Sequence, residues 1–183
     1  MVAKSKMALV FLVALGTTSV VWAGPTAATT KSVPSTNRTA AASAANQNIV
    51  NKRTGISFYA LDGFVHQSIA SYYEVSVYNR ALGIQILIQN PAGAVSIANG
   101  HTFLTNWLGD TGLTFGASKY VREGFGKVAD LAFSNQPSAG QFRLYGRDLR
   151  FTDGLKSYDV VIDSPNASAA IRTANLLLST WGT

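Results

Sequence analysis

The sequence predicts an α+β domain in which two helices pack on one face of a twisted antiparallel sheet. Apolar residues alternate with polar ones over most of the second half of the chain, and in two segments they change to helical spacing. The two segments follow groups of strands instead of alternating with single strands, which gives the order β-β-β-α-β-β-β-β-α. With 183 residues, 47% of them apolar and none of them cysteine, the core must be sufficient without disulfides.

The first 23 residues have the pattern of a Sec-type signal peptide. Lys4 and Lys6 precede the apolar stretch Met7–Leu15, and Val21-Trp22-Ala23 places small residues at the −3 and −1 positions of a cut before Gly24. The stretch is shorter than the roughly 20 residues that span a bilayer. We therefore expect cleavage and a periplasmic or extracellular protein.

Residues 24–51 are expected to form a flexible linker. Up to residue 48 they are almost all Ala, Thr, Ser, Asn, Gln and Pro, with Val33 as the only larger apolar residue. Such a segment buries too little apolar surface to offset the entropy of ordering it. Residues 52–183 are then predicted to form a single domain.

The charge balance is mildly basic. The whole chain has 15 Lys and Arg against 9 Asp and Glu, and removal of the signal peptide with its two lysines leaves 13 against 9, a net charge of +4. This excess favours an anionic surface or an envelope protein as partner, but it is too small to indicate nucleic acid.

Three strands are predicted before the first helix, over residues 55–61, 73–77 and 82–88. Their apolar side chains recur at every second position, which is typical of a sheet with one buried face. Turn residues end the first and third strands, at Asp62-Gly63 and Asn90-Pro91-Ala92-Gly93.

The first helix is predicted over residues 94–108. Ile97, His101, Leu104 and Leu108 recur at helical spacing, and Gly109 can end the helix. Because His101 lies on this apolar stripe, we expect it to be a hydrogen-bonded helix residue and not a ligand.

Four strands and a last helix complete the domain. The strands are predicted over residues 113–117, 125–133, 141–151 and 155–163, and Asp153-Gly154 is the strongest hairpin signal in the sequence. Asn166 can cap the final helix, residues 167–181, whose apolar stripe contains Ala170, Ala174, Leu177 and Trp181.

This order resembles the PsbP-like superfamily, which includes DcrB-like periplasmic members and lipid-binding LpqN-like members. Three segments suggest the resemblance: Gly55-Ile56-Ser57-Phe58, then residues 82–91 leading into a helix, and residues 145–165 leading to Leu178-Ser179-Thr180-Trp181. The proline–aromatic opening of the family is absent, and Leu61-Asp62-Gly63-Phe64 stands in its place. The resemblance covers most of residues 53–183 and implies the same α+β fold.

The sequence predicts no catalytic, cofactor or metal site. His66 and His101 are 35 residues apart, there is no cysteine, and no Gly-x-Ser-x-Gly segment occurs. The stretch Gly124–Ala129 fits G-x-G-x-x-A, but a strand follows it where a nucleotide loop needs a helix. Asp148, Asp159 and Asp163 come from the two arms of one predicted hairpin. Their positions are best explained by cross-strand ion pairs with arginine or lysine, not by a catalytic pair of carboxylates.

Two candidate binding surfaces remain. One is a basic surface with an interleaved aromatic, which suits an anionic partner, although a solvated strand face or protection of a sheet edge is the favoured explanation. It comprises Arg143, Tyr145, Arg147, Arg150 and Lys156. The other is an apolar lining between helices and sheet, which suits a lipid, although ordinary core packing is the favoured explanation. It comprises Phe103, Trp107, Leu177 and Trp181.

These observations favour an exported, non-catalytic binding or assembly-accessory protein of the cell envelope, docking on a protein or an anionic surface without a cofactor. One alternative is a periplasmic carrier of a small apolar or lipid ligand. Another is a hydrolase with scattered catalytic residues.

Overall fold

A computed structural model of the chain describes residues 46–68, 73–91, 94–109, 112–135 and 143–182. The predicted signal peptide and residues 24–45 of the predicted linker lie outside the described residues. The elements are, in order, β1 (Asn46–Val50), β2 (Ser57–Leu61), β3 (Phe64–His66), β4 (Tyr73–Asn79), β5 (Ile84–Gln89), α1 (Ile97–Leu108), β6 (Leu113–Glu123), β7 (Gly126–Asn135), β8 (Tyr145–Asp153), β9 (Lys156–Ser164) and α2 (Ala167–Thr180).

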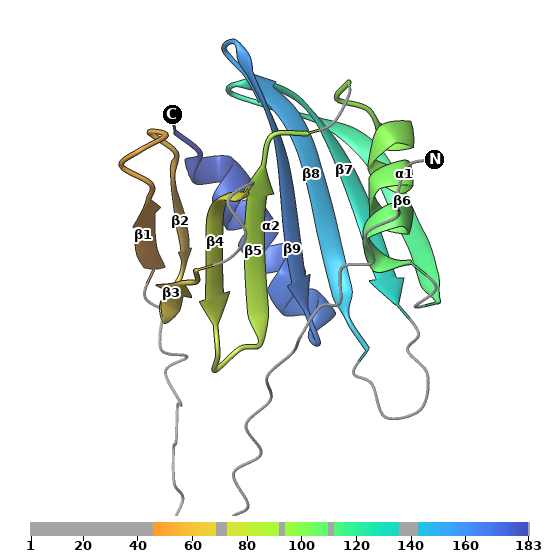
Figure 1. The fold of residues 1–183 in the computed structure, drawn as a ribbon, viewed down its shortest axis with the longest axis horizontal. Coiled ribbons are helices and arrows are strands. Elements are labelled where there is room, and N and C mark those ends of the chain that lie inside the picture. Colours follow the sequence, from red (N-terminus) through yellow and green to blue (C-terminus); the bar gives the residue numbers. More distant parts are fainter. Residues whose placement is uncertain (1–45, 69–72, 92–93, 110–111, 136–142, 183) are drawn as a thin grey trace, which may run out of the picture. The chain divides into compact units, whose positions relative to one another are not determined.

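Seven of these strands form one antiparallel sheet in the order β3-β4-β5-β9-β8-β7-β6, and β1 pairs with β2 in a separate two-stranded sheet (Figure 1). The predicted α+β class, with an antiparallel sheet and two packed helices, is confirmed. None of the helices in the described ranges has the length and apolar character needed to cross a membrane.

The two helices lie on opposite faces of the sheet, not on one face as predicted (Figure 1). Helix α2 packs with β2 against the face that carries Ile86 and Ile88, whereas α1 packs against the face that carries Leu87. The physical reason is that the central strands are buried on both sides. In β9 the side chains of residues 158–164 are all buried, so each face needs its own cover.

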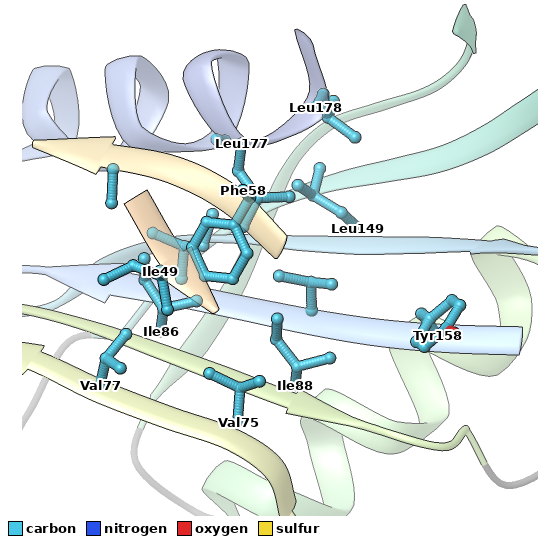
Figure 2. Close-up of a cluster of buried hydrophobic side chains, with 14 of the residues drawn as sticks. Ile49, Phe58, Val75, Val77, Ile86, Ile88, Leu149, Tyr158, Leu177 and Leu178 are labelled. Carbon is cyan, nitrogen blue, oxygen red and sulfur yellow. The ribbon is translucent and has the colours of Figure 1, made fainter. Parts of the chain in front are cut away.

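The larger core lies between α2 and the sheet. Figure 2 shows Leu177 and Leu178 of α2 and Phe58 of β2 facing the aliphatic side chains of β4, β5 and β8. An aromatic group closes one end of this core, where the Trp181 ring lies edge-on to Phe151 and Tyr158 with centroids 4.8 and 4.9 Å away. Apolar burial of this extent is the main stabilising contribution of the fold.

The predicted start of the domain at residue 52 is too late, because the end of the predicted linker forms β1. Ile49 is buried, and the Gln47 amide donates to the Phe64 carbonyl while its oxygen accepts from the Phe64 N–H. The composition of this segment did not predict a strand because only one apolar residue of it is buried. Backbone pairing with β2 and the hydrogen bonds of one polar side chain hold the strand in place. Strand β3, which begins at Phe64, was also not predicted.

Three of the predicted turn and cap residues are confirmed, whereas Ala92 and Gly93 of the predicted turn at residues 90–93 lie outside the described residues. Gly154 has φ 61° in a two-residue β8–β9 turn, with Asp153 paired to Lys156. Asn166 accepts a hydrogen bond from the Ala169 N–H at the start of α2. Gly109 ends α1 with φ 56°, a conformation that favours glycine.

Candidate functional site

A small surface hollow lies where the first turn of α2 crosses β7 and β8. Its volume is about 110 Å³, well below the roughly 300–1,000 Å³ of small-molecule sites. Half of its eight lining residues are alanine or glycine, which leaves the space open. The lining consists of Ala132, Phe133, Tyr145, Gly146, Arg147, Ala167, Ala170 and Ile171.

A basic rim flanks this apolar hollow. The Arg147 guanidinium forms a two-bond ion pair with Asp130, with Nε 2.7 Å from Oδ1 and Nη2 bonded to Oδ2. The pair holds Arg147 in place, since the arginine side chain is 15% and the aspartate side chain 4% exposed. Beside it, the exposed Arg143 places its guanidinium 5.2 Å from the centre of the Tyr145 ring.

The structure divides the predicted basic surface into three parts. Arg143, Tyr145 and Arg147 gather at the hollow. Arg150 is 1% exposed, so it lies inside the domain and not on a surface. Lys156 lies beyond the other end of β8, at the β8–β9 turn, and strand geometry puts it about 25 Å from Tyr145.

Arg150 belongs to a buried polar cluster under α1. Its Nη2 lies 3.4 Å from Asp159 Oδ2, which confirms one of the expected cross-strand ion pairs. Gln89 donates to the same carboxylate oxygen at 3.0 Å, and the Phe103 ring centre lies 5.8 Å from the guanidinium carbon. Burying such an ion pair costs desolvation free energy. The pair stabilises the fold only if the remaining polar atoms of both side chains are hydrogen-bonded.

Asp148 completes this cluster. Burial raises the pKa of Asp148 well above its usual range, and the negative charge of the neighbouring Asp159 carboxylate raises it further. The smaller effect of Arg150 opposes these. Burial and the neighbouring carboxylate therefore both favour the neutral form of Asp148. The cluster has no opening among the described residues, because all three side chains are at most 1% exposed.

A further buried carboxyl, Asp163, lies near the other end of β9. It pairs in register with Gln85 of β5 and Gly146 of β8, and burial raises its pKa to about 7. This group is thus partly protonated at neutral pH.

The predicted apolar lining does not come together. Phe103 and Trp107 lie in the cluster under α1, and Leu177 and Trp181 lie in the core under α2. Because the sheet separates the two pairs, they cannot line one ligand cavity. Each pair packs as ordinary core.

The two histidines form no metal site within the described ranges, where no group of three or more His, Cys, Asp or Glu residues is placed to hold a metal ion. His66 is exposed on β3. His101 lies on α1 as predicted, with Nε2 3.3 Å from Ser118 Oγ and its ring 4.0 Å from that of Phe115. No carboxylate within the described residues hydrogen-bonds to His101. The His101–Ser118 pair therefore lacks the acid that orients the histidine in a catalytic triad.

Sequence reasoning missed the α2 side of the hollow and its anchor, Asp130. A signal existed for Asp130, an isolated acid in the otherwise apolar stretch Val128–Phe133. No local signal marks Ala167, Ala170 and Ile171, because they meet β8 only through the packing of α2.

The fold is similar to those of several solved structures. The Ran-binding protein Mog1p of Saccharomyces cerevisiae matches with a TM-score of 0.58 at 11% identity, covering 76% of this chain and 96% of that protein. PsbP (CyanoP) from Synechocystis sp. PCC 6803 matches with 0.56 at 11%, covering 76% and 93%. A Mog1 single-residue mutant matches with 0.54 at 8%, covering 75% and 95%.

No family model matches the sequence, and no curated protein matches it. At these identities the likeness concerns the fold alone. The domain therefore has the Mog1/PsbP α+β fold, which the resemblance to PsbP-like proteins predicted.

Proposed function

We propose that this protein is an exported, non-catalytic accessory protein that docks on a partner protein of the cell envelope through the α2–β8 hollow. The observation that carries the proposal is an apolar hollow of about 110 Å³ bordered by Tyr145 and a fixed Arg147. Tyrosine and arginine beside a small pocket are typical of protein-binding hot spots. The fitting partner presents one apolar side chain next to a carboxylate.

Charge and exposure support this choice of partner. Arg143 is exposed and has no ion pair within the described residues, so it is available to an acidic group. Ile171 is 43% exposed, so a partner that covers the hollow would bury apolar surface on this lining residue. A carrier of lipid is disfavoured, since the predicted apolar lining is split by the sheet.

Photo-crosslinking tests the docking site. A photoreactive amino acid placed at position 171 is expected to capture one main partner in the producing cells, whereas the same residue at Val65, 60% exposed on β3, captures none of it. With the identified partner, Ile171→Glu and Arg143→Glu are each expected to raise the Kd at least about 30-fold. Their matched controls are Val65→Glu and the exposed Arg80→Glu.

Equal binding by the site variants and the controls would reject the hollow as the docking site. Export is tested separately by cell fractionation and N-terminal sequencing. The proposal expects a mature chain that begins at Gly24, outside the cytoplasm. A cytoplasmic chain that retains residues 1–23 would reject export.

A further inference from the structure

Leu155, at the tip of the β8–β9 hairpin, is fully exposed, with a relative accessibility of 104%. The turn does not require it. Gly154 supplies the positive φ, and the described non-glycine residues all have negative φ, so the second turn position accepts polar residues as well. A leucine that packs against nothing in its own domain gains only from an external apolar environment.

Exposed cations lie next to this leucine in the chain and on the neighbouring hairpin. Lys156 is the next residue, and Arg122 and Lys127 are neighbours across the adjacent β6–β7 hairpin. Both hairpins turn at the same end of the sheet (Figure 1). The Lys127 ammonium lies 3.7 Å from the centre of the Tyr120 ring, which is 46% exposed and adds an amphipathic aromatic to the same region.

The β1–β2 loop brings two more exposed cations, Lys52 and Arg53, to this end. The C-terminal residues connect this loop to the hairpin base. The Ser57 N–H donates to the Gly182 carbonyl at 2.8 Å, and Trp181 Nε1 donates to Asp153 Oδ2 at 3.0 Å. We call Lys52, Arg53, Arg122, Lys127, Leu155 and Lys156 the tip surface.

The acids near the tip surface are partly buried, whereas its cations are exposed. Asp153 accepts the bond from Trp181, Glu74 has a buried carboxylate oxygen, and Glu123 is half-buried. The exposed charge at this end is consequently positive, which favours a negatively charged, extended surface over a neutral one.

We propose that the tip surface binds an anionic lipid bilayer, with Leu155 inserted at the level of the headgroups and the surrounding cations against lipid phosphates. One apolar anchor combined with a basic cluster is the pairing that gives stable but reversible attachment to a membrane surface. This inference does not depend on the α2–β8 hollow, which lies at the other end of β8.

Vesicle co-sedimentation with the mature chain tests this proposal. Binding is expected to vesicles that contain phosphatidylglycerol, to fall as salt is added, and to be absent with phosphatidylcholine alone. Lys156→Gln is expected to weaken binding about fivefold, and Leu155→Ser by about tenfold or more. The matched controls, Arg80→Gln and Val65→Ser, lie at the other end of the sheet and leave binding unchanged.

Insertion has a direct readout because the chain has no cysteine. An environment-sensitive fluorophore on Leu155→Cys is expected to shift to the blue on phosphatidylglycerol vesicles, whereas the same label on Val65→Cys does not shift. The absence of vesicle binding, or an equal response at both positions, would overturn the proposal. So would tip variants that bind vesicles normally but lose crosslinking to a protein partner, since the tip would then belong to a protein interface. Circular dichroism confirms that each variant is folded.

Discussion

The ring of Phe133 lies directly on the backbone of Gly146, its neighbour across the β7–β8 ladder. A Cβ atom added at Gly146 would lie 2.1 Å from Phe133 Cζ. Both residues are also in the lining of the α2–β8 hollow. The glycine is required for the close approach of an aromatic ring, not for an unusual φ.

Gly146→Ala is therefore expected to destabilise the domain. Phe133 must leave its position, and overpacking of this kind costs about 1–3 kcal/mol of unfolding free energy. Urea unfolding measures the change, with Gly124→Ala as control because its Cβ would meet nothing within 4 Å. A Gly146→Ala protein as stable as the control would show that the ring is free to move.

Breaking the buried Arg150–Asp159 pair is expected to be costly. Arg150→Met leaves the Asp159 carboxylate, 0% exposed, without its cation, and such changes cost about 3–5 kcal/mol. Adding Asp159→Leu removes the orphaned charge and is expected to restore much of the loss. A double-mutant cycle by chemical unfolding measures this coupling. Simple additivity of the two single effects would contradict it.

The stability of the domain is expected to fall between about pH 4 and pH 7. Unfolded aspartic acid titrates near pH 4, whereas burial raises the pKa of Asp163 in the folded domain to about 7. The folded state therefore holds more protons, and the contribution of this group is complete below the unfolded pKa and lost as the pH rises through the folded pKa. The raised pKa of Asp148 acts in the same direction.

Asp163→Asn tests this dependence, because the amide stays neutral. Its unfolding free energy is expected to decline less with pH over this window and to exceed that of the wild type above pH 7. Chemical unfolding at a series of pH values measures both curves. Parallel curves for the two proteins would show that Asp163 is not the group responsible.

Removal of the α2 cap is expected to loosen the helix end that borders the hollow. Asn166→Ala loses the side-chain acceptor for the Ala169 N–H, which costs about 0.5–2 kcal/mol. Asn166→Asp keeps an acceptor and is expected to retain the stability. Thermal unfolding followed by circular dichroism distinguishes the two variants, and equal losses in both would exclude the cap as the cause.

Local signals were sufficient for most elements of the fold. Gly154 and Asn166 have backbone requirements that are visible in the sequence, and the structure places them as predicted. The turn at Gly154 also sets the register that brings Arg150 opposite Asp159. This pairing can therefore be predicted from the sequence once the hairpin is recognised.

The side of the sheet on which each helix lies was harder to predict. Alternation suggested one buried face, but Leu87 lies between Ile86 and Ile88, and Val161 lies between Val160 and Ile162. These unbroken apolar runs indicate burial on both faces. The hollow had no such signal, because it arises where alanine and glycine residues of two strands and a helix meet in space.

The pairing of Ser57 with Gly182 has a consequence for the order of assembly. Two backbone hydrogen bonds, 2.8 and 2.9 Å long, join the start of β2 to the second-last residue of the chain. As the ribosome makes the chain from its amino end, the start of β2 gains this partner only after residue 182 has been made. The attachment of the β1–β2 ribbon at this point is consequently completed only after all the described helices and strands have been synthesised.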